Sequence, residues 1–129
     1  PVDTASLGRG TIVTIKGDGF FEPGSADIDE RVQPLLARIA AALNSVKGQV
    51  LITGHTDNQP IRSMRFPSNW HLSQERANAV KTFLATAVSP DRLRAEGRAD
   101  AEPVEPNDTP AGRSRNRRVE VTLFVQAGS

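Results

Sequence analysis

Several residue types and patterns are missing from this chain, and each absence excludes a class of chemistry. There is no cysteine, so disulfide bonds, thiolate zinc sites and thiol catalysis are excluded. The 16 basic residues are matched by 15 acidic ones, so no excess of one charge attracts nucleic acid or an anionic membrane. No apolar run approaches the roughly 18 residues that a membrane-spanning helix needs. No aromatic residue interleaves the arginine-rich segment at 112–120, so a base-stacking surface is not expected there.

Catalytic and phosphate-binding motifs are missing as well. The sequence contains no nucleophile elbow, no glycine-rich phosphate loop and no Walker-type lysine. His55 and Asp57 could act as an acid–base pair, but no visible group would stabilise an oxyanion or activate water. Together with His71 they could also be considered as metal ligands; we interpret the two histidines instead as hydrogen-bonded residues at the rim. We therefore expect a protein that is not an enzyme and needs no metal and no cofactor.

The periodicity of the 129 residues predicts one domain built from strands and helices. β-Branched and alternating stretches predict the strands, and apolar residues at helical spacing predict the helices. The expected strands are at 11–16, 49–53, 93–97 and 117–125, and the expected helices run from about 32 to 46 and from about 69 to 86. The second strand is apolar on successive residues, which is typical of a strand covered on both faces.

This order, β-α-β-α-β-β, predicts an α/β fold: a two-layer sandwich in which both helices pack on a mixed sheet. The final strand alternates between two different faces and can pair antiparallel. Residues 1–9 have no period and are expected to be a flexible linker or frayed terminus. The domain is expected to span 10–125, and 126–129 to form a tail.

An aspartate and an arginine occupy positions where local structure does not require a charge. Asp57 lies just beyond Thr53, the last residue of the predicted central strand, at the sheet edge where open α/β sheets usually bind ligands. Arg76 lies one turn after Leu72 and one turn before Val80, so it shares a helix side with core residues. A cation near the start of a helix is not favoured by the helix dipole. Another reason must account for Arg76.

Three interpretations of these two residues stay open at this point. Asp57 would form an Asx-turn with the amide of Gln59 and only shape its loop. Alternatively, Asp57 and Arg76 would form a structural ion pair, since an unpaired buried charge is costly. In the third interpretation they flank a ligand that carries both charges, because an arginine fork binds a carboxylate and an aspartate binds an ammonium group. Such a ligand would be an amino-acid zwitterion.

Three segments in this order resemble the OmpA-like peptidoglycan-binding domain. They are TGHTD at 53–57, NWHLSQERANAV at 69–80 and GRAD..PVEPNDTPAGRSRNRRVEV at 97–121. The resemblance covers roughly residues 10 to 125, and the fold of that family has the element order predicted above.

The resemblance implies a binding site for the diaminopimelate side chain of the cell-wall stem peptide. In that family the acid of the first segment holds the ammonium group and the arginine of the second holds the carboxylate, which places Asp57 and Arg76 in these roles. Polar groups and walls of the pocket would come from Asn69, Thr56, Leu72 and Phe21. Arg118 would be a structural partner of the sheet end.

The loop between Asp57 and Asn69 is longer than in porin-type members of that family. It resembles the loop of two inner-membrane subgroups, the flagellar stator proteins and the carboxy-terminal extension of a type VI secretion protein, and further segments favour the secretion subgroup. The resemblance thus implies a periplasmic domain whose partners are peptidoglycan and other subunits of a secretion or motor complex. Nucleic acid is not expected as a partner, because of the balanced charge noted above.

Pro1 is not a natural start residue, so we expect the chain to be part of a longer protein. Contact with the membrane is expected only through a span that precedes Pro1. Whether the domain forms a homodimer stays open. So does a role as a protein–protein scaffold that has lost wall binding.

Overall fold

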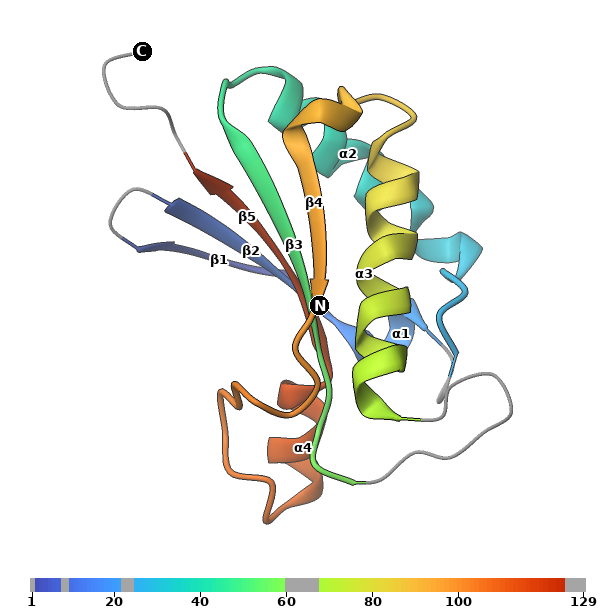
Figure 1. Ribbon diagram of the computed structural model, residues 1–129, viewed down its shortest axis with the longest axis vertical. Coiled ribbons are helices and arrows are strands. Elements are labelled where there is room, and N and C mark those ends of the chain that lie inside the picture. The colour runs from blue at the N-terminus through green and yellow to red at the C-terminus, as the bar shows by residue number, and fades with distance from the viewer. Residues whose placement is uncertain (1, 8–9, 22–24, 60–67, 125–129) are drawn as a thin grey trace.

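A mixed five-stranded sheet with helices on one face forms the body of the domain (Figure 1). The computed structural model describes residues 2–7, 10–21, 25–59 and 68–124. The strands are β1 (Val2–Leu7), β2 (Gly10–Lys16), β3 (Gln49–His55), β4 (Leu93–Gly97) and β5 (Arg118–Phe124). The helices are α1 (Gly17–Phe20), α2 (Gln33–Asn44), α3 (Asn69–Leu84) and α4 (Pro110–Asn116), with 3-10 turns at Glu30–Val32 and Pro90–Arg92. The predicted two-layer α/β sandwich is confirmed.

The sheet has the order β1-β2-β5-β3-β4. β3 and β4 are parallel, and α3 connects them. β5 is antiparallel to both of its neighbours, β2 and β3. The last strand of the chain therefore lies inside the sheet, and it brings the carboxyl ends of β2 and β3 to its own beginning.

The expectation of a linker or frayed end at residues 1–9 is wrong for Val2–Leu7. These residues form β1 and pair antiparallel with β2, from Val2 opposite Ile15 to Leu7 opposite Gly10. An edge strand can be held through its backbone hydrogen bonds alone and needs no apolar period. The apolar pattern therefore contains no signal for it. The tail expected at 126–129 lies outside the described residues.

The hydrophobic core lies between the sheet and the two long helices. α2 and α3 cover the same face of the sheet (Figure 1). The sheet contributes buried residues from alternate strand positions, and the helices contribute residues spaced three or four apart. Members of this core include Ile15, Val50, Ile52, Val119 and Val121 from the strands and Leu36, Ala40, Leu43, Ala77, Val80 and Leu84 from the helices. No helix among the described residues is long and apolar enough to cross a membrane.

Two glycines let the first half of α3 lie directly against the sheet. Gly54 on β3 is opposite Gly97 on β4, and a Cβ atom at Gly54 would collide with the carbonyl of Ser73. The helix is also tied to this edge: Gln74 accepts the N–H of Gly97 at 2.9 Å, and the Ser73 hydroxyl accepts the N–H of Ala99 at 3.1 Å. These contacts fix the distance between the carboxyl end of β3 and the side chains of α3.

Candidate functional site

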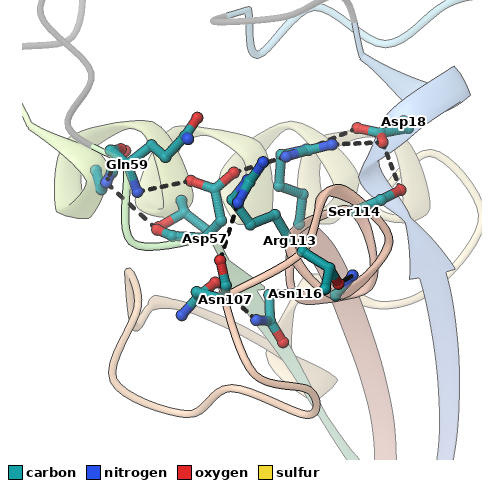
Figure 2. Close-up of polar contacts among 12 residues, drawn as sticks. Asp18, Asp57, Gln59, Asn107, Arg113, Ser114 and Asn116 are labelled. Carbon is teal, nitrogen blue, oxygen red and sulfur yellow. Dashed lines mark hydrogen bonds and ion pairs between the residues drawn. The ribbon is translucent and has the colours of Figure 1, made fainter.

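Asp57 lies just beyond β3 and is buried, with 7% of its surface exposed. Its Oδ1 accepts the N–H of Gln59 at 3.0 Å, and its Oδ2 accepts Nη1 of Arg117 at 2.6 Å. Figure 2 shows the Asp57 carboxylate beside Gln59. The Asx-turn of the first interpretation is present, but it accounts for only one of the two carboxylate oxygens.

Arg76 is buried on α3, with 5% of its surface exposed. Its Nε donates to the carbonyl of Ser25 at 2.7 Å, and its guanidinium lies over the ring of Phe21, 4.8 Å from the centroid. Burial lowers the pKa of Arg76 to about 10, while the negative charges of Asp18 and Asp57 oppose this shift. Arg76 is therefore a buried cation at neutral pH.

The alternative of a direct Asp57–Arg76 ion pair is wrong. Both contacts of the Asp57 carboxylate among the described residues are to other groups, Gln59 and Arg117. Yet Asp57 is among the charges that raise the pKa of Arg76, so the two side chains influence each other electrostatically. Arg117 is near both of them, since it bonds Asp57 and its carbonyl lies with Arg76 Nη1 beside Gly17. The site thus holds an acid and a base that are not bonded to each other.

Arg117, which precedes β5, joins Asp57 to a second acid. Its Nε and Nη2 donate to the two oxygens of Asp18, each at 2.9 Å, and the Ser114 hydroxyl donates to Asp18 Oδ2 at 2.6 Å (Figure 2). The Arg117 bond lowers the pKa of Asp18, and the bonds to both acids raise the pKa of Arg117. Asp18, Asp57, Arg76 and Arg117 therefore form a cluster of two acids and two bases with no net charge.

Sequence reasoning missed Asp18 and Arg117 as members of this site. For the arginine-rich segment at 112–120 the sequence only argued against base stacking, and Arg117 was not connected to Asp57. The sheet register explains why they meet. Lys16 on β2 is opposite Arg118 on β5, so the segment that follows Lys16 lies beside Arg117, which precedes Arg118. That register is known only once the strand order is known.

The structure also locates the other residues that the resemblance implied. Asn69 begins α3, and its amide donates to the carbonyl of Gln59 at 2.8 Å, which ties the helix to the Asp57 segment. Thr56 is buried, and its hydroxyl donates to the carbonyl of Asp57 at 2.8 Å. Leu72 is buried against Ala26. Of the predicted set, Phe21 and Arg76 are in direct contact, and Asn69 and Thr56 bond the backbone beside Asp57.

Arg118 has the structural role that was expected of it. It is buried, with 4% of its surface exposed, and Nε donates to Glu120 at 2.7 Å. Its other nitrogens donate to the carbonyls of Glu102 at 2.9 Å and Asn116 at 3.3 Å. Residues 60–67, which make up most of the long loop between Asp57 and Asn69, lie outside the described residues.

The interpretation of both histidines as rim residues is wrong for His55. His71 is exposed and accepts or donates a hydrogen bond with Ser68 at 2.7 Å, but His55 is only 2% exposed. β3 extends to His55 because the backbone ladder continues to Arg118. Burial, and then the Arg118 charge, lower the pKa of His55 to about 4, against the opposing charges of Glu120 and Glu102. Within the described ranges no three His, Cys, Asp or Glu residues are grouped to hold a metal ion.

Buried His55 should make the domain less stable in mild acid. Because its pKa is lowered in the folded state, the unfolded chain takes up the proton first as the pH falls below about 6.5. The free energy of unfolding should therefore decrease from pH 7 to pH 5, by on the order of 2 kcal/mol from this residue. Urea denaturation at pH 7 and at pH 5 measures this decrease. His55→Gln should remove most of the difference, whereas His71→Gln should leave it unchanged.

The chain belongs to the OmpA family, whose model matches residues 20–117. Among solved structures, it is similar to the cell wall anchor of the type VI secretion system from Pseudomonas aeruginosa. The TM-score is 0.92 and the identity 52%, over 97% of this chain and 88% of that chain. It is also similar to the periplasmic domain of Helicobacter pylori MotB, with a TM-score of 0.90 and 25% identity, over 100% of this chain and 85% of that one.

Among curated proteins, Motility protein B of Bacillus subtilis is 38% identical over 134 aligned residues, which cover 99% of this chain and 50% of that protein. The chain spans about half the length of the first curated relatives that it matches. The family resemblance carried by the three sequence segments is confirmed.

Proposed function

We propose that this domain binds peptidoglycan without catalysis and anchors a membrane-embedded machine to the cell wall. The observation that carries the proposal is the separation of Asp57 from Arg76. Both are buried, Asp57 just beyond β3 and Arg76 on α3, and their side chains are not bonded to each other. A structural ion pair would neutralise the two charges internally. Two opposite charges that are not bonded to each other suit a ligand that carries both.

The ligand that we propose is the diaminopimelate of the stem peptide. The end of its side chain carries an ammonium group and a carboxylate on one carbon. Asp57 would accept the ammonium group, since an ionised carboxylate offers about four acceptor positions and Asp57 uses two. The guanidinium of Arg76 would bind the carboxylate through charge-assisted bonds. Because the ligand group is a zwitterion, binding leaves the neutral cluster neutral.

The machine that we propose is a type VI secretion complex, with the domain in the periplasmic part of an inner-membrane protein like TssL. Support comes from the 52% identity to the Pseudomonas aeruginosa cell wall anchor of that system, compared with 25% to the Helicobacter pylori MotB domain. The alternative is an anchor of a flagellar stator, as in MotB. In either case the partners are peptidoglycan and other subunits of the complex, and a homodimer is compatible with both.

One observation favours a different function, that of a protein–protein scaffold without wall binding. Asp57 already has a cationic partner in Arg117, so the cluster is satisfied without a ligand. Sedimentation with purified cell-wall sacculi separates the two functions. A peptidoglycan-binding domain should leave the supernatant with diaminopimelate-type sacculi, and soluble diaminopimelate-containing stem peptide should compete. A scaffold should remain in the supernatant at every concentration of sacculi.

A further inference from the structure

The two hydrogen bonds to Asp57 decide where its carboxylate can accept a ligand. One comes from the backbone N–H of Gln59 and the other from Nη1 of Arg117. Each oxygen has therefore one acceptor position occupied and, for an ionised carboxylate, about one more to offer. The backbone bond fixes one oxygen, so the second bond fixes the rotation of the carboxylate plane.

Arg117 is itself held in place from two directions. Asp18 receives two parallel bonds from its guanidinium, and Ser114 bonds the same Asp18 carboxylate (Figure 2). The backbone adds a further constraint, because the N–H of Gly17 donates to the carbonyl of Arg117 at 2.7 Å. With only 32% of its side chain exposed, Arg117 reaches Asp57 from a fixed position at the junction of β2 and β5.

Without Arg117, Asp57 would be a buried carboxylate that has lost its cationic partner. Such a charge is costly, so the side chain would turn to another cation. Arg76 is the cation at hand, because its Nη1 and the carbonyl of Arg117 both lie beside Gly17, 3.5 and 2.8 Å from the place that a Cβ atom would take there. A turn of Asp57 towards Arg76 would create an ion pair that is absent from the structure. Asp57 and Arg76 would then bind each other instead of the ligand.

We propose that Arg117 is a positioning residue, which keeps Asp57 from pairing with Arg76 and so holds the two charges apart for the ligand. Asp18 and Ser114 hold Arg117 in this role. The inference rests on the proposed function, in which Asp57 and Arg76 bind the ammonium group and the carboxylate of diaminopimelate. Arg117 acts through Asp57 and need not touch the ligand.

The first test measures affinity for a soluble stem-peptide fragment that ends in diaminopimelate, by titration calorimetry. Arg117→Gln should weaken binding by roughly 10- to 100-fold, by analogy with the loss on replacing a residue that orients a metal-binding side chain. Arg117→Lys keeps the charge but reaches only one of the two acids at a time, so its loss should be smaller. Arg115→Gln removes another arginine of the same segment, paired with Glu105, and should bind like the wild type.

The second test asks whether Arg117 keeps Asp57 and Arg76 apart, and it needs no ligand. A double-mutant cycle of Asp57→Asn and Arg76→Gln measures their coupling in the unfolding equilibrium. We expect a coupling below about twofold in the wild-type background and above about tenfold in the Arg117→Gln background, a difference that a merely structural role of Arg117 would not produce. If Arg117→Gln does not fold, Asp18→Asn, which releases the arginine fork, should shift both measurements in the same direction.

Equal coupling in both backgrounds, or full affinity in a folded Arg117→Gln variant, would overturn the inference. Failure of the wild type to bind the fragment would instead refute the proposed function. In that case the coupling measurement alone would decide whether Arg117 separates the pair.

Discussion

Replacing either Asp57 or Arg76 is expected to abolish sedimentation with cell-wall sacculi while the domain stays folded. Asp57→Asn keeps the shape of the side chain and removes its charge, and Arg76→Lys keeps the charge but removes the fork of N–H donors. Truncating one member of a buried, hydrogen-bonded charge pair typically costs about 2–5 kcal/mol of binding free energy. This corresponds to a loss of affinity from roughly 30-fold to several thousand-fold.

The controls for this prediction are exposed residues of the same types. Asp91→Asn and Arg38→Gln lie away from the site, in exposed positions, and should sediment like the wild type. Circular dichroism and thermal unfolding show whether each variant is folded. Arg76→Lys is expected to lose some stability, because Arg76 also packs over Phe21 and bonds the carbonyl of Ser25. Retention of wild-type sedimentation by both site variants would contradict the assignment.

Gly54→Ala, on β3, is expected to cause a large loss of stability. The new Cβ atom would collide with the backbone carbonyl of Ser73, which cannot move aside as the end of a flexible side chain could. Overpacking of a rigid contact costs about 3 kcal/mol, or roughly 10 °C in melting temperature for a domain of this size. The strand and α3 would have to separate, which would move Arg76 relative to Asp57.

Gly19→Ala is the matched control for this substitution. Gly19 has a φ of 98°, and no atom of the described residues lies within 4 Å of the position that a methyl group would take there. The change therefore tests backbone strain without a collision, and strain of this kind costs about 1 kcal/mol. In thermal unfolding, the melting temperature of Gly54→Ala should be clearly lower than that of Gly19→Ala. The reverse order would show that the close approach of α3 to β3 is not a rigid contact.

The main elements of the fold could be predicted from the sequence because their apolar residues recur at strand or helix spacing or, for β3, form a continuous run. β2, β3, β4, β5, α2 and α3 all lie where the apolar pattern indicates. β1 could not be predicted, since an edge strand held by backbone bonds needs no such pattern. The insertion of β5 between β2 and β3 was also hidden, because strand order depends on contacts between distant parts of the chain.

Some features of the candidate site could likewise be predicted from the sequence, and others could not. The burial of Arg76 followed from its helical spacing to Leu72 and Val80. The pairing of Asp57 with Arg117 could not be predicted. Arg117 lies 60 residues further along the chain, and only the order of the strands in the sheet brings it next to Asp57. The burial of His55 was hidden for a related reason: its strand continues beyond the apolar run, opposite Arg118.

The most direct test of the two-charge site compares two stem-peptide fragments that differ only in their third residue, diaminopimelate or lysine. Lysine lacks the carboxylate that Arg76 is proposed to bind, so the lysine fragment should bind at least about 30-fold more weakly in titration calorimetry. A diaminopimelate fragment amidated at that carboxylate should be weakened similarly. Equal affinity of the well-folded wild type for the lysine and diaminopimelate fragments would contradict the site.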